Sequence, residues 1–439
     1  MNETLNISGK HIAVFGAGRS GVAAAALALR EGAKVSMWDQ GNMEVFKNVP
    51  ADVEIHTNLT ISDAENFVAD IIVLSPGIDT YSPLVQAFSV KTFLMGETEF
   101  ASRFYKGGII GITGTNGKTT TTELVARILK GAGKGGTPCG NYGMPLSEVV
   151  LASDVPSAVS LELSSFQLET IHTLHPNVSI WLNFAPDHMD RYPTVEAYKN
   201  AKLRIFENQT ADDTAIVRYG EELGKIAPKA LTFSTESRDA DFYSDGKTIF
   251  HRGNAILDLE VKTALRGLHN AENAMAAIAA CLAYGIEKEV IMHALEGYAP
   301  PPHRCELVRT LDGVEYLNDS KATNLHALQC AIRSQSRPVV LIAGGKDKGL
   351  DYSEVIPYLQ KQVLEVITFG EIAHSLAYLF GTVVPCSTFT TLEQATHQAR
   401  SVAPRGSTVL LSPGTSSFDQ FKGYEHRGNV FREIVQQLH

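Results

Sequence analysis

The strongest candidate for chemistry in this sequence is the turn Gly114–Thr119, which reads GTNGKT and follows the apolar run Ile109–Ile112. A glycine-rich turn between a buried strand and a helix points backbone N–H groups and the positive end of the helix at one spot, which favours a bound phosphate. Lys118 adds a positive charge there, and the Thr119 hydroxyl can hold Mg²⁺. The general P-loop pattern has a glycine where this chain has Ile112, so the motif is a shorter form. A structural turn with an incidental lysine is the alternative, and the strand and helix context favours the phosphate site.

Two further strand ends offer metal ligands for such a phosphate. Glu162 directly follows the predicted strand Ala158–Leu161. The next apolar strand is followed by a turn that holds Asp187, His188 and Asp190. Parallel strands of one sheet end at the same edge, so a carboxylate there is placed to hold Mg²⁺ beside the phosphate. A lone histidine is usually structural, but its position at a neighbouring strand end favours contact with a metal.

Two helical segments carry polar residues whose role the pattern leaves open. A basic helix is predicted over 198–206 and contains Lys202, and such a run usually forms a solvated helix face. A long alanine-rich helix begins near Gly267 with His269, Asn270 and Asn273. Polar groups at a helix start need partners, so these three residues are either helix caps or ligand contacts.

The N-terminal segment is predicted to form a nucleotide-binding sheet. The strand His11–Phe15 leads into GAGRSG at 16–21, and the strand Lys34–Trp38 is followed by Asp39. The glycines allow a tight turn and close approach of a phosphate, and the acidic residue can accept a hydrogen bond from a ribose or base. The later strand 70–74 ends in SPGI, at the same ligand-binding edge. The expected ligand is a dinucleotide or a nucleotide diphosphate.

The C-terminal part of the chain is predicted to form a further α/β unit. Alternating patterns over 212–260 first predict a small sheet appended to the central unit. The segment Gly297–Arg304 contains three consecutive prolines, which exclude a helix and indicate a linker. Beyond it, strands alternate with helical stretches, and the predicted strands are Val314–Leu317, Val339–Ile342, Val366–Phe369 and Val409–Leu411. Polar residues follow each strand, so we expect a mostly parallel sheet with a small-molecule site at one edge.

Composition narrows the class of protein. The chain has 439 residues, 44% hydrophobic and 20% charged, which is typical of a globular protein with about three domains. Its formal net charge is -10 and it has no basic stripe, which argues against a nucleic-acid partner. No basic start with a long apolar core precedes the first strand, so we expect a cytoplasmic protein with no membrane partner. The five cysteines are scattered, which argues against a disulfide framework or a zinc site.

The chain resembles the Mur ligase family in a series of segments that follow one another in order: GITGTNGKTT, ELSSFQLE, NFAPDHMDRY, AKLRIF, GLHNAENAMAA, PPHR, NDSKATN, GGKDKG and LSPGTSSFDQF. The resemblance spans the whole chain, and several of these segments are seven or more residues long. The DNPR signature of the diaminopimelate- or lysine-adding members is absent. SSFQLE and SSFDQF are similar to the D-glutamate-adding branch of the family.

The resemblance implies an α/β fold with three domains. These are a Rossmann-like UDP-binding domain over 1–95, a central P-loop ATPase-like mononucleotide-binding domain over 96–300, and a Rossmann-like C-terminal domain over 301–439 that binds D-glutamate and closes on ATP. The implied activity is an ADP-forming, ATP-dependent amide ligation of D-glutamate to UDP-N-acetylmuramoyl-L-alanine in peptidoglycan precursor synthesis. The reaction would pass through an acyl phosphate and a tetrahedral intermediate. We expect a monomer that uses these small-molecule substrates.

The resemblance also implies cofactors and site residues. It implies ATP, two Mg²⁺ ions and a CO₂-derived carbamate on Lys202. The implied catalytic residues are Lys118, Glu162, His188 and Lys202, and the metal ligands are Thr119, Glu162, His188 and the carbamylated Lys202. The implied ATP contacts are Gly114, Thr115, Asn116, Gly117, Lys118, Thr119, Thr120, Asn270, Asn273, Arg304, Asp319 and Lys321. The UDP and muramoyl contacts are Arg19, Ser20, Asp39, Ser75, Pro76, Gly77, Asn141 and Gln167. The D-glutamate contacts are Thr323, Lys348, Ser417, Phe418 and Tyr424, and the sequence leaves open whether Lys346 or Lys348 supplies the charge.

Two other classes of protein fit part of the pattern. An NAD-dependent oxidoreductase would use GAGRSG and Asp39 but would leave the phosphate turn and the third domain without a role. A non-catalytic nucleotide-binding protein would keep the phosphate turn but would not need Glu162, His188 and Lys202, all of which are present. The ligase is therefore the favoured interpretation.

Overall fold

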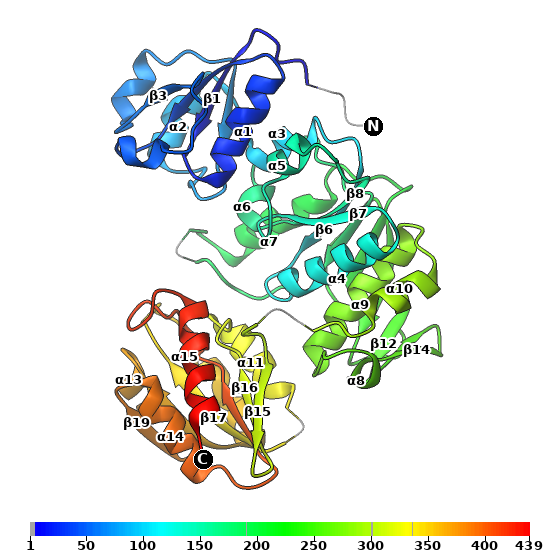
Figure 1. The fold of residues 1–439 in the computed structure, drawn as a ribbon, viewed down its shortest axis with the longest axis vertical. Coiled ribbons are helices and arrows are strands. Elements are labelled where there is room, and N and C mark those ends of the chain that lie inside the picture. The colour runs from blue at the N-terminus through cyan, green and yellow to red at the C-terminus, as the bar shows by residue number, and fades with distance from the viewer. Residues whose placement is uncertain (1–4, 190, 300–301, 336) are drawn as a thin grey trace. The chain divides into compact units, whose positions relative to one another are not determined.

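The structure is a computed structural model that describes residues 5–189, 191–299, 302–335 and 337–439. The described strands form three sheets, each flanked by helices (Figure 1). Backbone contacts divide the chain into two compact units, one up to residue 257 together with 272–296, the other of 258–271 and 297–439. Asp190, Pro300 and Pro301, which the sequence analysis singled out, lie outside the described residues.

The N-terminal sheet is parallel, with the order β3-β2-β1-β4-β5. Its strands are β1 (His11–Phe15), β2 (Lys34–Trp38), β3 (Glu54–His56), β4 (Ile71–Leu74) and β5 (Phe93–Gly96). Its helices are α1 (Arg19–Arg30), α2 (Pro83–Ser89) and α3 (Glu97–Ser102), with 3₁₀ turns at Met43–Phe46 and Ile61–Glu65. β2 and β3 lie on one side of β1, and β4 and β5 lie on the other. The strand order therefore reverses between β1 and β4, and the loops after these two strands border the position where open α/β sheets bind ligands.

The central sheet has the order β14-β13-β12-β11-β10-β9-β6-β8-β7. Its strands are β6 (Gly108–Thr113), β7 (Gly135–Gly140), β8 (Ala158–Glu162), β9 (Val178–Trp181), β10 (Thr214–Arg218), β11 (Lys229–Ser234), β12 (Phe242–Ser244), β13 (Thr248–His251) and β14 (Asn254–Asp258). The helices in this stretch and just after it are α4 (Lys118–Gly131), α5 (Leu146–Leu151), α6 (Ser165–Leu168), α7 (Val195–Leu203), α8 (Leu259–Lys262), α9 (Leu268–Ala283) and α10 (Lys288–Leu295), with a 3₁₀ turn at Arg204–Phe206. β6 pairs in parallel with β8 and β9, so the segments that carry the phosphate turn, Glu162 and His188 leave one edge together.

The strands in the small sheet predicted over 212–260 are part of the central sheet itself. β10 pairs in parallel with β9, and Thr214 lies opposite Val178. β11 and β12 continue the same sheet in parallel, and β13 turns back antiparallel to β12. The backbone N–H and C=O groups at the edge of β9 therefore form hydrogen bonds with β10, the next strand along the chain. This pairing extends the central sheet.

A continuous apolar core joins the first two sheets. It contains residues of β1 and α1, such as Ile12 and Leu27, and residues of the central sheet, such as Val159 and Trp181, all buried. Phe100 of α3 belongs to the same core. The two sheets therefore share a core within the first compact unit.

The C-terminal sheet has the order β15-β16-β20-β17-β18-β19, with β15 antiparallel to β16 and the other pairs parallel. Its strands are β15 (Glu306–Leu311), β16 (Val314–Asn318), β17 (Val339–Gly344), β18 (Val363–Phe369), β19 (Cys386–Phe389) and β20 (Thr408–Leu411). Its helices are α11 (Leu325–Arg333), α12 (Ile356–Gln362), α13 (Ala373–Phe380), α14 (Leu392–Val402) and α15 (Tyr424–Gln437), with a 3₁₀ turn at Tyr352–Val355.

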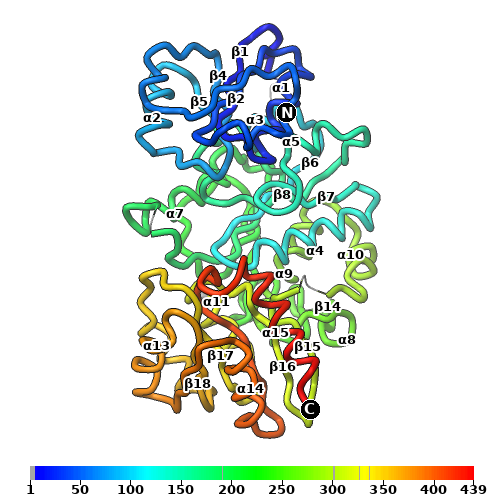
Figure 2. The backbone as a smooth tube through the Cα atoms, turned by 60° about the vertical axis from the view of Figure 1, so that its left-hand side comes forward, coloured from blue at the N-terminus to red at the C-terminus, as the bar shows by residue number. Residues whose placement is uncertain are grey.

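Both faces of this C-terminal sheet are covered by helices (Figure 2). One core cluster contains residues of α11, α12 and α13, and a second contains residues of α14 and α15. The strands alternate between the two clusters, with Leu341 in the first and Ile342 in the second. The sheet is therefore buried on both sides, as the mostly parallel arrangement requires.

No helix among the described residues is long and apolar enough to cross a membrane. The five cysteines are free thiols, either buried or half-buried, as the scattered spacing predicts.

Candidate functional site

The phosphate turn joins β6 to α4 and is held by the loop that follows β9. Gly117 has a φ of +86°, which suits glycine, and begins the helix that Lys118 continues. The backbone N–H of Thr115 donates to the Asn183 carbonyl at 3.0 Å, and the N–H of Asn116 donates to the Asn183 side-chain oxygen at 3.0 Å. The turn is thereby fixed before any ligand arrives.

The Lys118 side chain folds back onto the turn that precedes it and contacts its main chain. Its Nζ donates to the carbonyl oxygens of Gly114 and Thr115, both at 2.9 Å. Thr119 is half-buried and Thr120 is buried, one and two residues further along α4. A phosphate would therefore replace carbonyl groups as a partner of the Lys118 ammonium.

Lys202 reaches the same turn from α7 and is almost fully buried, with 1% of its surface exposed. Its Nζ donates to the Gly114 carbonyl oxygen at 2.9 Å, the atom that Lys118 also contacts. Burial, with the nearby charge of Lys118, lowers the pKa of Lys202 well below its ordinary value, while Asp187 and Glu162 act in the opposite direction. Lys202 therefore does not lie on the solvated helix face that basic runs of this kind usually form.

Glu162, at the end of β8, has one carboxylate oxygen without a protein partner. Oε1 accepts a hydrogen bond from Asn141 Nδ2 at 2.7 Å. Oε2 is buried and has no hydrogen-bond partner among the described residues. Burying an unpaired carboxylate oxygen is costly, and a cation is the group that would remove the cost. The residue therefore fits the metal-ligand role that the resemblance implies.

His188 lies on the loop after β9 in a left-handed conformation, with a φ of +58°. Its side chain is 45% exposed, and its Nε2 lies 3.9 Å from Asp187 Oδ2. The ring packs edge-to-face against Phe166, with centroids 5.0 Å apart. Within the described residues, no three His, Cys, Asp or Glu side chains form a group able to hold a metal ion. A complete metal site is thus not assembled from these residue types alone.

A small cavity, open to solvent, lies beside the loop after β4. Its wall includes Ser75 and Pro76 of that loop and Gln167 of α6. The Ser75 hydroxyl donates to the Gly16 carbonyl at 3.2 Å, which joins the cavity wall to the first glycine turn. A Cβ on Gly21 would lie 1.9 Å from that same carbonyl oxygen, so only glycine fits there. Ser75, Pro76 and Gln167 therefore lie together, as the predicted substrate contacts require.

Arg19 and Asp39, two other predicted substrate contacts, are already paired in this structure. Arg19 forms a two-pronged ion pair with Glu148, with distances of 2.8 and 2.7 Å. The Asp39 carboxylate accepts the backbone N–H groups of Ala17 and Gly41, both at 2.8 Å. Asp39 therefore holds the glycine turn in shape, a role that its spacing did not distinguish from ligand contact.

Two polar residues near the start of α9, Asn270 and Asn273, form hydrogen bonds within the protein. Asn270 Nδ2 donates to the Arg266 carbonyl at 3.0 Å. Asn273 Oδ1 accepts from the Thr121 hydroxyl at 3.4 Å and would lie 2.2 Å from a Cβ on Gly117. Asn273 is thus packed directly against the phosphate turn.

In the C-terminal unit, Asp319 and Lys321 lie just after β16. Asp319 accepts the N–H of Cys305 at 3.2 Å and the hydroxyl of Ser412 at 2.9 Å. Burial raises the pKa of Asp319 to about 7, although its hydrogen bonds and Arg304 oppose the shift. Lys321 Nζ lies over the Tyr424 ring, 3.8 Å from its centroid. These predicted contacts for ATP and D-glutamate are thus neighbours at one sheet edge.

The other predicted D-glutamate residues lie on the loops of the same edge. Lys348 Nζ lies 3.4 Å from the Thr323 carbonyl oxygen, while Lys346 pairs through its backbone with Ser416. Ser417 is buried, and Phe418 is 66% exposed. The side chain of Lys348 is therefore the one that reaches Thr323.

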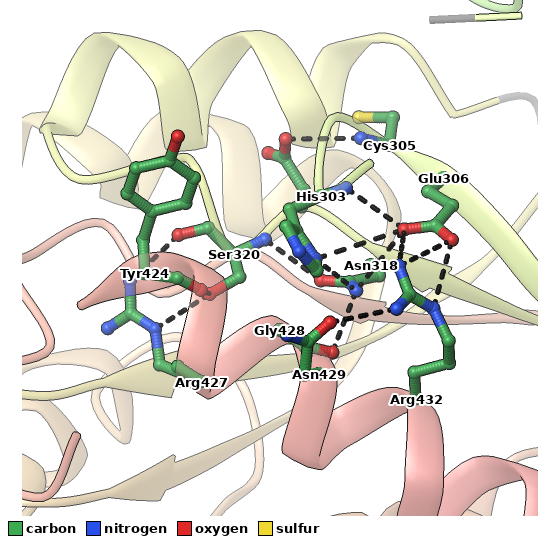
Figure 3. Close-up of polar contacts among 11 residues, drawn as sticks. His303, Cys305, Glu306, Asn318, Ser320, Tyr424, Arg427, Gly428, Asn429 and Arg432 are labelled. Atoms are coloured by element: carbon green, nitrogen blue, oxygen red, sulfur yellow. Dashed lines mark hydrogen bonds and ion pairs between the residues drawn. The ribbon is translucent and has the colours of Figure 1, made fainter. Parts of the chain in front are cut away.

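A buried arginine and a polar cluster, both missed by sequence reasoning, organise this edge (Figure 3). Arg427 is fully buried and donates to Ser320 and to the carbonyls of Thr415 and Ser416. Burial lowers its pKa to about 10. Nearby, Asn318 Nδ2 contacts His303 Nδ1 at 2.9 Å and the Gly428 carbonyl at 3.0 Å (Figure 3). Most residues of α15 are polar, so the sequence does not indicate that Arg427 is buried.

Comparison with family models matches three parts of the chain. The description "Mur ligase MurD-like, N-terminal domain" matches residues 10–93, "Mur ligase middle domain" matches 112–281, and "Mur ligase, glutamate ligase domain" matches 303–414. Each matched part contains strands of one sheet, which confirms the predicted three-domain α/β architecture. The exact boundaries at 95 and 300 stay a prediction.

Full-length relatives and solved structures agree with this match. A UDP-N-acetylmuramoylalanine–D-glutamate ligase of Geobacter metallireducens is 38% identical over 99% of both chains, and one of Myxococcus xanthus is 39% identical over 99% of this chain and 100% of the relative. The MurF ligase of Thermotoga maritima in complex with ADP has a TM-score of 0.62 at 16% identity and covers 100% of this chain and 97% of its own. The MurC ligase of the same organism has a TM-score of 0.58 at 19% identity, over 97% and 99%. The chain therefore belongs to the Mur ligase family.

Proposed function

We propose that the chain is an ATP-dependent, ADP-forming ligase that joins D-glutamate to UDP-N-acetylmuramoyl-L-alanine, in the synthesis of peptidoglycan precursors. The observation that carries the proposal is the meeting of Lys118 and Lys202 on the Gly114 carbonyl oxygen, close enough to Glu162 for its charge to act on Lys202. The substrate assignment follows the printed names of relatives that match almost the whole chain.

The phosphate turn would hold the terminal phosphates of ATP. The N–H groups at the start of α4 would contact these phosphates, and Lys118 would turn from its two carbonyl partners to the γ-phosphate. Transfer of this phosphoryl group to the L-alanine carboxylate would give an acyl phosphate. The amine of D-glutamate would then attack that carbonyl carbon, and the tetrahedral intermediate would release phosphate and form the amide.

Mg²⁺ at this site would neutralise the charge that builds up on the transferred phosphoryl group. Thr119 and Glu162 would hold one ion, and Glu162, His188 and Lys202 the other. The unpaired Glu162 Oε2 supports this role, because its burial is otherwise uncompensated. Asn141, which occupies Oε1, would leave Oε2 facing the metal.

Lys202 would act as a carbamate, formed by the uncharged amine and CO₂. An uncharged amine is the form that reacts with CO₂, and the burial of Lys202 beside Lys118 favours that form. Carbamate formation would turn a positive group into a negative one that can contact a metal. The neighbouring Lys118 charge, which disfavours an ammonium at Lys202, would favour the carbamate.

The other proposed contacts follow the loops of the three sheets. Ser75, Pro76 and Gln167 would contact the UDP-linked sugar, and Lys348 the D-glutamate. We propose that the enzyme is a cytoplasmic monomer, since its substrates are ATP and a nucleotide-linked sugar, and light scattering would test the monomer.

Phosphate release from ATP tests the proposed function. We expect release only when UDP-N-acetylmuramoyl-L-alanine and D-glutamate are both present, with a product heavier by one glutamyl residue in mass spectrometry. Glu162→Gln should lower kcat by roughly 100-fold, because a neutral amide is a poor Mg²⁺ ligand. Glu196→Gln, on the exposed start of α7, is the matched control and should keep the wild-type rate. Release that does not depend on either substrate would contradict the proposal.

A further inference from the structure

The wall of the cavity after β4 contains two further buried polar side chains beside Gln167. Thr98 and Glu97 begin α3, directly after β5, and both line the cavity with Gln167. Each of the two is 1% exposed and Gln167 is 4% exposed. Burying a carboxylate and a hydroxyl costs free energy unless both groups form hydrogen bonds. The hydrogen-bond partners of Glu97 and Thr98 therefore indicate their role.

The direction of the Gln167 amide is fixed by its own partners. Its Oε1 accepts from the Ser164 N–H and from the Ser164 hydroxyl, both at 3.0 Å. Since a backbone N–H can only donate, the amide oxygen must face Ser164. The amide nitrogen therefore faces Thr98, and one of its two N–H groups donates to Thr98 Oγ1 at 3.0 Å. The second N–H has no hydrogen-bond partner among the described residues, and Gln167 lines the cavity.

Glu97 in turn sets the direction of the Thr98 hydroxyl. The hydroxyl donates to Glu97 Oε2 at 3.3 Å, so its lone pairs face Gln167. Glu97 Oε1 accepts the Ser147 N–H at 2.7 Å, which anchors the carboxylate on α5. The result is a chain of hydrogen bonds from Ser147 through Glu97 and Thr98 to Gln167, in which each donor has one acceptor.

We propose that Thr98 and Glu97 are positioning residues for the UDP-linked sugar: they hold the Gln167 amide so that its remaining N–H points at an acceptor oxygen of that substrate. The proposal rests on the proposed function, since it names the substrate of the same site. It concerns binding of this one substrate and leaves the chemistry at Glu162 and Lys118 unchanged.

A purely structural role is the alternative, and the same region offers a matched comparison. Thr173 Oγ1 donates to the buried carboxylate of Glu99 at 2.9 Å, a Thr–Glu pair that joins the segment after α6 to α3. Thr173 is not part of the cavity wall. Replacing Thr173 by valine therefore measures the general cost of losing such a bond, without any effect on the Gln167 amide.

Substrate affinity in Thr98→Val tests the proposal. Valine keeps the shape of threonine but cannot accept from Gln167, so we expect the KM for UDP-N-acetylmuramoyl-L-alanine to rise about tenfold, with kcat and the KM values for ATP and D-glutamate unchanged. Thr98→Ser should restore the wild-type KM because it keeps the hydroxyl. Thr173→Val should leave all three KM values unchanged, even where it lowers the melting temperature.

A double variant separates action through Gln167 from direct contact with substrate. If Thr98 acts through Gln167, then Thr98→Val combined with Gln167→Ala should have the same KM as Gln167→Ala alone. Independent, multiplied effects would overturn the proposal. So would a Thr98→Val enzyme whose affinity for the UDP-linked sugar equals that of the wild type.

Calorimetric binding of UDP-N-acetylmuramoyl-L-alanine distinguishes failure of this inference from failure of the proposed function. If the wild type binds the compound but does not turn it over, the ligase assignment is wrong and the positioning role is still judged by the affinity of Thr98→Val. If the wild type is an active ligase and Thr98→Val binds equally tightly, the positioning role alone is wrong. A wild type that does not bind the compound overturns both.

Discussion

Lys202 and Glu162 are two buried ionisable side chains that the protein satisfies only in part. Lys202 has a main-chain carbonyl as its hydrogen-bond partner and shares it with Lys118. Glu162 has one oxygen bonded to Asn141 and the other unpaired within the described residues. Buried charged groups that lack hydrogen-bond partners lower the stability of the folded protein. They are typical of binding sites, where a bound ligand or metal ion supplies the missing partners.

Removing the Lys202 side chain should abolish most activity in a way that small acids can repair. In Lys202→Ala we expect kcat to fall by roughly 100-fold and to recover in part with acetate or another short carboxylate, which would take the place of a carbamate. Phosphate release with both substrates is the measurement. Lys199→Ala on the same helix is the control, since Lys199 is partly exposed and donates to the Glu222 carbonyl, away from the phosphate turn. No rescue by any short acid would argue against a carbamate.

Sequence patterns pointed to candidate site residues but not to the contacts that these residues make. Glu162, His188 and Lys118 stand out because they follow apolar strands or a glycine turn. The bonds from Asn141 to Glu162 and from Gln167 to Thr98 join residues far apart in the chain, so no local spacing reveals them. Burial of Lys202 likewise follows from packing against the turn after β6 and has no signature in the basic helix itself.

At the scale of elements, the strands with continuous apolar runs were predicted and the edge strands were not. β8 and β9 are buried throughout, β6 is buried after Gly108, and all three match the predicted runs closely. β15 and β19 were missed because they are half-exposed edge strands, as the half-buried CSTF of β19 illustrates. An edge strand packs on one side only, so its sequence carries a weaker hydrophobic signal.

The turn before α4 should tolerate no side chain at Gly117. In Gly117→Ala, the φ of +86° is strained and the added Cβ would lie 2.2 Å from Asn273 Oδ1. We expect ADP affinity, measured by calorimetry, to fall at least tenfold. Gly133→Ala is the matched control at the other end of α4, because it has a φ of +69° but no atom within 4 Å of the new Cβ. That control should lose about 1 kcal/mol of stability and keep its affinity, and equal effects of the two changes would contradict the prediction.

At the scale of the whole molecule, the two compact units have separate cores. The first two sheets share one apolar cluster, whereas the C-terminal sheet has its own clusters on its two faces. We therefore expect scanning calorimetry to show more than one unfolding transition, because separately packed units unfold as separate cooperative blocks. A single two-state transition would contradict this expectation.

The pH dependence of the C-terminal transition should identify Asp319. Its folded pKa of about 7 lies above the ordinary value of 3.8, so the folded unit keeps a proton that the unfolded chain releases. Its contribution to stability is thus fully present below about pH 4 and is lost as the pH rises through about 7. Asp319→Asn stays neutral, and we expect its C-terminal transition to melt about 5 °C above that of the wild type at pH 8, with a smaller gap at pH 5. The transition of the first unit serves as the internal control, and a gap that does not change with pH would contradict the prediction.

The Gly114 carbonyl oxygen accepts a hydrogen bond from each of the two lysine side chains, so a change of charge on Lys202 would act directly beside the phosphate turn. A carbamate on Lys202 would reverse the sign of the charge beside this oxygen, and would attract Mg²⁺ where an ammonium repels it. By thermodynamic reciprocity, Mg²⁺ would then strengthen the binding of CO₂ by the same factor by which CO₂ strengthens the binding of Mg²⁺. The nucleotide site would therefore respond jointly to metal and inorganic carbon.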